Sequence, residues 1–203
     1  MTLKLSGAEA AAALHVFGIV FRNADPFDQP FTDEIVDRCL LYPVGYCLEK
    51  EELSALIAAA STVGEHRAYL FESEGFFGSN RDDRGLWEFD LSDDPYPEML
   101  RQGLTGIGET AVYSVRGTWG LLISHEQHAV VGGSRAFMAG FREYMGGLEA
   151  SIEAFLEFWK DNRERFGVAV QWIPAMLDHL YGREAARRML TASRFPEMIV
   201  GEG

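Results

Sequence analysis

Residues 110–133, TAVYSVRGTWGLLISHEQHAVVGG, decide the fold. Three runs rich in β-branched and aromatic residues are separated by turn signals at Gly117-Thr118 and at His125-Glu126-Gln127. Such runs predict three short strands, and the helical spacing of apolar residues after Ser134 predicts a helix directly behind them. The stretch therefore predicts a meander at the centre of an antiparallel sheet.

Two more strands are predicted before the meander, at residues 68–72 and 86–91, the second with strict alternation of apolar and polar residues. Apolar residues at helical spacing predict helices on either side of this strand block. These helices cover residues 6–20, 32–40, 51–63, 134–145, 148–166, 174–181 and 183–192, with a short helix or turn at 97–103. The fold class is therefore α+β, with a mainly antiparallel sheet of about five short strands in residues 68–131.

The length of 203 residues suits one domain, residues 1–203. Because no strand is predicted after the meander, residues 148–203 either complete this domain or form a helical C-terminal appendage. A 47% hydrophobic fraction with 12% aromatic residues is ample for a buried core.

The net charge of −13 restricts the kinds of partner. Nucleic acids and anionic membranes bind through Lys and Arg, so both are excluded as partners, whereas a basic protein is favoured. The longest apolar run near the N-terminus is far shorter than the roughly 18 residues that span a bilayer. We therefore expect a soluble cytoplasmic protein. Cys39 and Cys47 are too few for a disulfide framework, and are expected to be structural thiols rather than nucleophiles.

His125, Glu126 and His128 form the one tight cluster of potential metal ligands in the sequence. Zinc-protease helices carry H-E-x-x-H, which places both histidines on one face; the spacing here is H-E-x-H, next to predicted strands. In an extended chain Glu126 and His128 share a face and His125 points away. A polar turn between two strands is favoured, with Glu126 and His128 kept as weak metal-ligand candidates.

Acidic residues are concentrated in residues 65–98, which hold ten carboxylates and three arginines. These carboxylates could solvate the surface, dock a basic protein, or serve acid/base or metal chemistry. The binding residues predicted from this region are Glu72, Glu74, Asp82, Asp83, Glu88 and Asp90. They surround a Gly-rich loop at residues 73–85, the kind of segment on which functional sites commonly lie.

Motifs for catalysis and cofactor binding are missing from the sequence. Ser134 lacks the flanking glycines of a nucleophile elbow, and the glycines of residues 103–108 are not followed by the lysine of a phosphate-binding loop. We therefore predict no catalytic residue and no cofactor.

An acidic α+β chain with a meander that carries Trp119-Gly120 and no catalytic motif resembles, in general character, the bacterial immunity proteins that neutralise toxins. The resemblance implies a non-enzymatic binding or inhibitor protein that engages a basic protein partner, and it carries over no residues. Two alternatives stay open. One is a small metal-dependent or carboxylate-based hydrolase near His125, Glu126, His128 and the 73–85 loop; the other is a homodimer that acts as an oligomeric scaffold.

Overall fold

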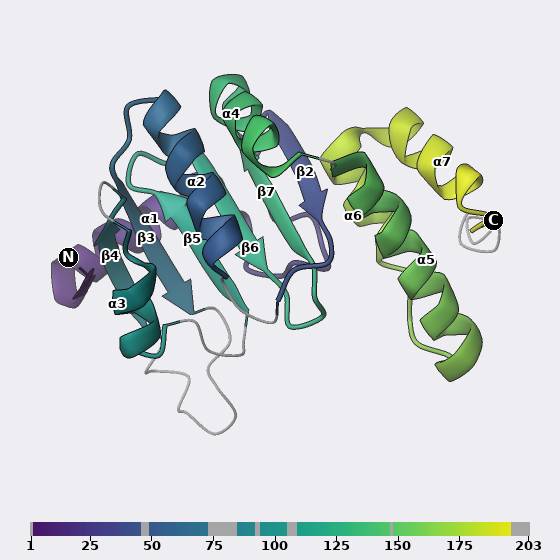
Figure 1. Ribbon diagram of the computed structural model, residues 1–203, viewed down its shortest axis with the longest axis horizontal. Coiled ribbons are helices and arrows are strands. Elements are labelled where there is room, and N and C mark those ends of the chain that lie inside the picture. The colour runs from purple at the N-terminus through teal and green to yellow at the C-terminus, as the bar shows by residue number, and fades with distance from the viewer. Residues whose placement is uncertain are drawn as a thin grey trace.

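The computed structural model describes residues 2–45, 49–72, 85–91, 94–104, 109–146 and 148–195. Within these ranges the chain forms a seven-stranded sheet and seven helices (Figure 1), which confirms the α+β class. The strand order is β1-β4-β3-β5-β6-β7-β2, and every neighbouring pair is antiparallel.

The elements follow one another in a mixed order along the chain. The strands are β1 (Thr2–Lys4), β2 (Asp37–Leu41), β3 (Arg67–Glu72), β4 (Leu86–Asp90), β5 (Thr110–Ser114), β6 (Trp119–Ile123) and β7 (Ala129–Gly133). The helices are α1 (Gly7–Val20), α2 (Lys50–Thr62), α3 (Tyr96–Arg101), α4 (Arg135–Met145), α5 (Leu148–Phe166), α6 (Ile173–Tyr181) and α7 (Arg183–Ala192).

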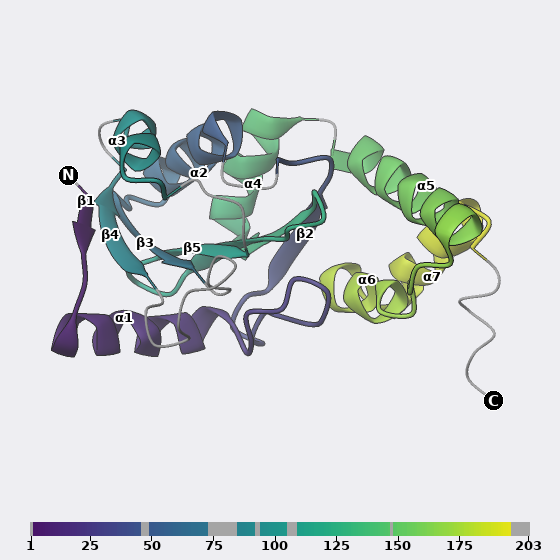
Figure 2. The same cartoon turned by 90° about the horizontal axis from the view of Figure 1, so that it is seen from below.

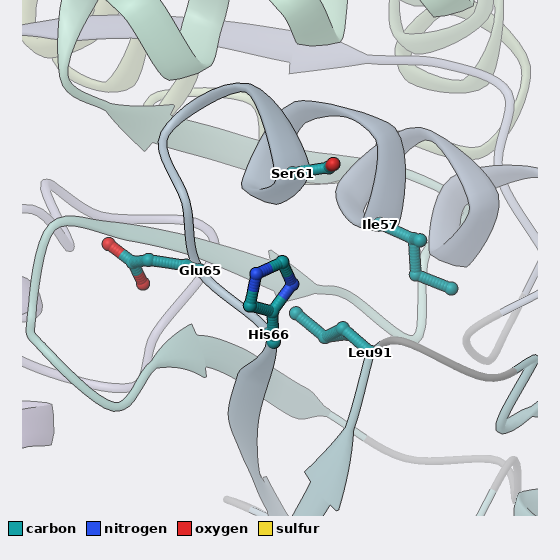
Figure 3. A pocket seen from close by; sticks show the side chains of 5 residues that line it. All are labelled: Ile57, Ser61, Glu65, His66 and Leu91. Carbon is teal, nitrogen blue, oxygen red and sulfur yellow. The ribbon is translucent and has the colours of Figure 1, made fainter.

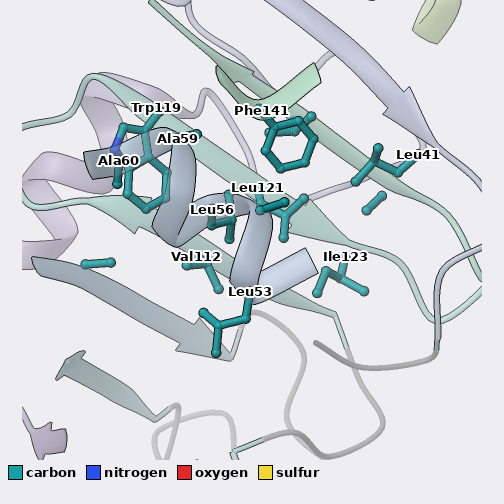
Figure 4. Close-up of a cluster of buried hydrophobic side chains, with 14 of the residues drawn as sticks. Leu41, Leu53, Leu56, Ala59, Ala60, Val112, Trp119, Leu121, Ile123 and Phe141 are labelled. Atoms are coloured by element: carbon teal, nitrogen blue, oxygen red, sulfur yellow. The ribbon is translucent and has the colours of Figure 1, made fainter. Parts of the chain in front are cut away.

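Helices cover both faces of the sheet. Figure 2 shows α2, α3 and α4 on one face and α1 on the other, with α5, α6 and α7 beyond β2. Under α2 and α4 the core is built around Trp119, whose ring stacks on Phe137 at a centroid distance of 4.9 Å. Leu56 and Leu121 meet in this cluster (Figure 4). Because both faces are covered, the central strands β5, β6 and β7 are buried along their whole length.

The predicted meander is confirmed. Strand β5 pairs with β6 from Thr110↔Ile123, and β6 pairs with β7 from Trp119↔Gly133, so that each hairpin closes at one of the two predicted turns. The Ser134 hydroxyl accepts a hydrogen bond from the Phe137 backbone N–H at 3.3 Å, as an N-cap does. Local turn and capping signals were therefore sufficient for this part of the sheet.

The helix predicted at residues 32–40 is wrong, and the strand count of about five is too low. Residues 37–41 form β2, which pairs with β7 over five residues. Cys39 and Leu41 are buried on the α4 side, whereas Leu40 is buried on the other. This alternation is the period of a strand buried on both faces; its apolar run also matches a helix, which is why the sequence pattern was ambiguous. Strand β1 was missed because it has three residues.

The C-terminal helices pack on the β2 edge and share a buried cluster with the α1 face of the sheet. Arg38 of β2 holds α6 in place through its guanidinium group. This group donates to the carbonyl oxygens of Ile35 at 2.7 Å, Thr32 at 2.9 Å and His179 at 2.7 Å. The last of these lies in the final turn of α6, where a cation is favoured by the helix dipole.

None of the helices within the described ranges is long and apolar enough to cross a membrane.

Candidate functional site

The predicted acidic residues within the described ranges lie on two different faces of the sheet. Glu72 has the same parity along β3 as Ala68 and Leu70, which are buried on the α2 face. Glu88 and Asp90 alternate along β4 with Trp87 and Phe89, and so lie on the α1 face. The sheet therefore separates Glu72 from the other two. Glu74, Asp82 and Asp83 lie outside the described residues.

Glu72 is half-buried at the end of β3. Burial raises the pKa of its carboxyl group, and the Gly85 backbone and the nearby Lys4 ammonium partly oppose this. The ammonium also lies 5.5 Å from the centre of the Trp87 ring. The Lys4 ammonium therefore offsets part of the negative charge of Glu72.

Glu88 is also partly neutralised. Its carboxylate accepts a hydrogen bond from Arg67 at 2.7 Å, and the Tyr69 ring lies opposite it across the strand pair. Burial raises the pKa of the Tyr69 hydroxyl, and the Glu88 charge raises it further. Asp90 lies opposite Arg67 in the same register. This part of the predicted acidic surface is thus a mixed-charge strip.

His128, predicted as a weak metal ligand, is a fully buried core residue. Its ring stacks on Trp172 at 5.5 Å and its Nε2 lies 3.2 Å from the Pro26 carbonyl oxygen. Burial lowers the pKa of the ring to about 4, although the Pro26 and Glu126 backbone groups favour the charged form. At neutral pH His128 is therefore an uncharged ring at the junction of the sheet with α5 and α6.

This burial makes stability depend on pH. With a pKa of about 4 in the folded protein against 6.5 for an ordinary histidine, only the unfolded chain binds the proton between these values. Stability is then lost as pH falls from 6.5 to 4, by about 3 kcal/mol in total from this residue. Burial also lowers the pKa of His179, which likewise reduces stability as pH falls. Burial raises the pKa of Glu52, which has the opposite effect and favours the folded protein at lower pH.

Urea unfolding of the wild type and His128→Phe from pH 7 to pH 4 isolates the contribution of His128. The variant should show a flatter decline, and NMR should show the His128 ring of the folded wild type neutral down to about pH 4. Parallel stability profiles together with a titration near pH 6.5 would contradict the prediction.

His125 and Glu126 lie on the surface of the β6–β7 turn, apart from the buried His128 ring. His125 Nδ1 lies 3.1 Å from Oε1 of Glu109, a buried carboxylate at the start of β5, and Nε2 lies 3.8 Å from Glu126. Sequence reasoning missed Glu109, although the β5–β6 register brings it beside the turn. The Glu109 and Glu126 carboxylates can together orient the His125 imidazole. Within the described residues, no group of three or more His, Cys, Asp or Glu side chains could hold a metal ion.

A shallow pocket of about 310 Å³ lies between the end of α2 and the β3–β4 edge (Figure 3). Ser61, Glu65 and His66 line it, but the Glu65 carboxylate points away from the imidazole. It instead accepts hydrogen bonds from the hydroxyl groups of Ser114 and Thr118 on the β5–β6 hairpin. The three side chains therefore do not form a catalytic triad, and Glu65 holds the hairpin turn.

Cys39 is a free, buried thiol. Burial raises its pKa to about 12, so that its reactive thiolate form is suppressed at neutral pH. Cys47 lies outside the described residues.

A groove of about 510 Å³ lies between α5 and α7. Ile152, Leu156 and Met189 form its apolar floor, and Glu153 and Glu157 form the rim on α5. Neither carboxylate has an ion-pair partner within the described part of the chain. Arg188 on the α7 rim is paired with Glu184 of its own helix at 2.7 Å. An apolar floor beside two unpaired carboxylates can receive an apolar side chain and a neighbouring cation.

Comparisons with known proteins returned no matching family model, no matching curated protein and no matching solved structure.

Proposed function

We propose that this is a non-enzymatic binding protein that engages a basic protein partner through the groove between α5 and α7. The observation that supports it is the position of two carboxylates, Glu153 and Glu157, on the rim of an apolar groove, where neither has an ion-pair partner among the residues that the structure describes. They are four residues apart on one helix, and therefore lie on the same side of it. The partner that fits is an amphipathic segment with apolar side chains and Lys or Arg beside them.

This proposal keeps the kind of partner predicted from the sequence and changes the surface. Lys4 offsets part of the Glu72 charge and Arg67 pairs with Glu88, so these two residues of the sheet offer less free negative charge than the α5 rim. The net charge of −13 adds a long-range attraction for a basic partner. A cytoplasmic location is part of the proposal, since a free buried thiol suits a reducing compartment.

The test uses a defined probe, a helix-forming peptide of about 14 residues with leucines on one face and lysines four residues apart beside them. Fluorescence anisotropy should show binding with a dissociation constant of roughly 10–100 µM at low salt, weakening as salt is raised. Glu153→Lys with Glu157→Lys should weaken binding about tenfold or more, because the rim then repels the peptide.

The matched control is Glu34→Lys with Glu143→Lys, which makes the same change in net charge at two exposed positions outside the groove. It should reduce affinity far less than the rim variant. A second variant, Ala192→Trp, fills the groove without changing charge and should also weaken binding. Equal affinities for the rim variant and its control, or equal binding of a peptide with glutamates in place of lysines, would refute the proposal.

A further inference from the structure

The two rims of the groove between α5 and α7 carry opposite charges. Glu153 and Glu157 form the rim on α5, and Arg188 lies on the rim on α7. The buried side chains of Ile152 and Leu156 lie between the rims as an apolar floor. A charged group that is attracted to one rim is repelled by the other, so the groove distinguishes the two sides of whatever binds in it.

The charge of the two helices beyond the rims acts in the same direction. Residues 183–194 hold four arginines and one glutamate, whereas residues 148–159 hold three glutamates and no Lys or Arg. A segment that is basic on all sides would therefore be attracted to α5 and repelled by α7. The segment that fits both helices is basic on the side that faces α5 and acidic on the side that faces α7.

Arg188 can exchange its present partner for a carboxylate of a bound segment. Its guanidinium pairs with Glu184 at 2.7 Å, one turn earlier on the same helix. The side chains are 68% exposed for Arg188 and 90% exposed for Glu184, so water screens the attraction between them. Exposed pairs at this spacing stabilise a helix only weakly. A carboxylate positioned over the groove would therefore displace Glu184 at small cost.

We propose that the groove fixes the direction of the helix that binds in it, an inference that rests on the proposed function. The partner helix carries Lys or Arg on one flank of its apolar stripe and Asp or Glu on the other. The cationic flank lies against Glu153 and Glu157, and the acidic flank lies against Arg188. Turning the helix end for end over the groove exchanges its two flanks, so that each flank then meets a rim of like charge. Only one of the two directions pairs both flanks.

Three helix-forming peptides of about 14 residues, all with leucines on one face, test the direction. The first has lysines on one flank and glutamates on the other, the second has these flanks exchanged, and the third has glutamines in place of the glutamates of the first. A nitroxide at the N-terminus of the first peptide should broaden the amide signals at one end of α5 most strongly. The same label on the second peptide should broaden those at the other end. Broadening at the same end with both peptides would overturn the proposal.

Affinity measurements test the role of Arg188. At low salt the first peptide should bind about threefold to fivefold more tightly than the glutamine peptide, and Arg188→Gln should remove this difference. Arg187→Gln is the matched control, because Arg187 is an exposed arginine of the same helix outside the described lining of the groove, and it should keep the difference. Glu184→Gln should raise the affinity for the first peptide by up to about twofold, because it releases Arg188. An Arg188→Gln variant that keeps the full difference would contradict the proposal.

Failure of this inference can be told apart from failure of the proposed function. If none of the three peptides binds, the proposed function is refuted and the inference with it. If all three bind with equal affinity and the label broadens both ends of α5 equally, the groove is a binding site that does not recognise direction, and only the inference is refuted.

Discussion

Phe155→Ala is expected to destabilise the protein by about 4 kcal/mol, the cost of removing a fully enclosed aromatic ring. The ring lies at the junction of α5 with the sheet. Its centroid is 5.5 Å from that of His128, 5.7 Å from that of Tyr42 and 5.9 Å from that of Trp172. These partners come from the β6–β7 turn, the segment after β2, and the start of α6. A cavity here would therefore loosen all three connections together.

Urea unfolding followed by near-ultraviolet circular dichroism measures this loss. Phe158→Ala is the matched control, because Phe158 lies on the same helix but is only partly buried, and it should cost roughly half as much or less. Hydrogen exchange should show the amides of α5, α6 and α7 losing protection before those of β5, β6 and β7. A loss below about 1 kcal/mol for Phe155→Ala would show that the helices are not anchored through this ring.

Glu65→Ala should lower the free energy of unfolding by about 3 kcal/mol, which is the second of the two largest effects that we expect. The side chain is 5% exposed, and both its oxygens accept hydrogen bonds, from Ser114 and from Thr118. Alanine would leave the fully buried Ser114 hydroxyl and the exposed Thr118 hydroxyl without this acceptor. The loss at Ser114 should dominate, since hydrogen bonds to charged groups are among the stronger ones. The β5–β6 turn, which these residues flank, should become more mobile.

Glu65→Gln separates hydrogen bonding from the loss of the side chain. Glutamine keeps the shape and one acceptor oxygen, and the hydroxyl groups can rotate to accept from its amide, so this variant should cost about 1 kcal/mol. A double-mutant cycle between Glu65→Ala and Thr118→Val should give a coupling energy of about 1 kcal/mol or more. Additive effects would contradict the role assigned to this carboxylate.

The sequence was most informative where structure is decided locally. The meander, the Ser134 cap and the helix ending before Gly64 each depend on residues close in the chain, and all three are confirmed. Ser6 marks the start of α1 as predicted, but its side chain makes no capping hydrogen bond, and Gly7 follows with a φ of +53°. A capping motif can thus place a helix end without forming its usual bond.

Features that depend on distant parts of the chain were harder to predict. Strand β2 was taken for a helix because its role is decided by β7, which lies about ninety residues later. Glu109 could have been found from the sequence, because aligning the two strands of the predicted β5–β6 hairpin places Glu109 beside His125. The groove between α5 and α7 could not be predicted in this way. The spacing of apolar residues shows which side of each helix is apolar, but it does not show which other helix that side contacts.

The strand order has a consequence for how the chain reaches its native state. During synthesis from the N-terminus, α1 and β2 emerge well before the meander with which they pack, and their apolar residues have no sheet to cover until β7 is complete. The local hairpins β5–β6 and β6–β7 close short loops, whereas joining β2 to β7 closes a long one at greater entropic cost. We therefore expect the meander to form first, with the two outer strands added to it afterwards, so that the earliest-made part of the chain is the last to be ordered.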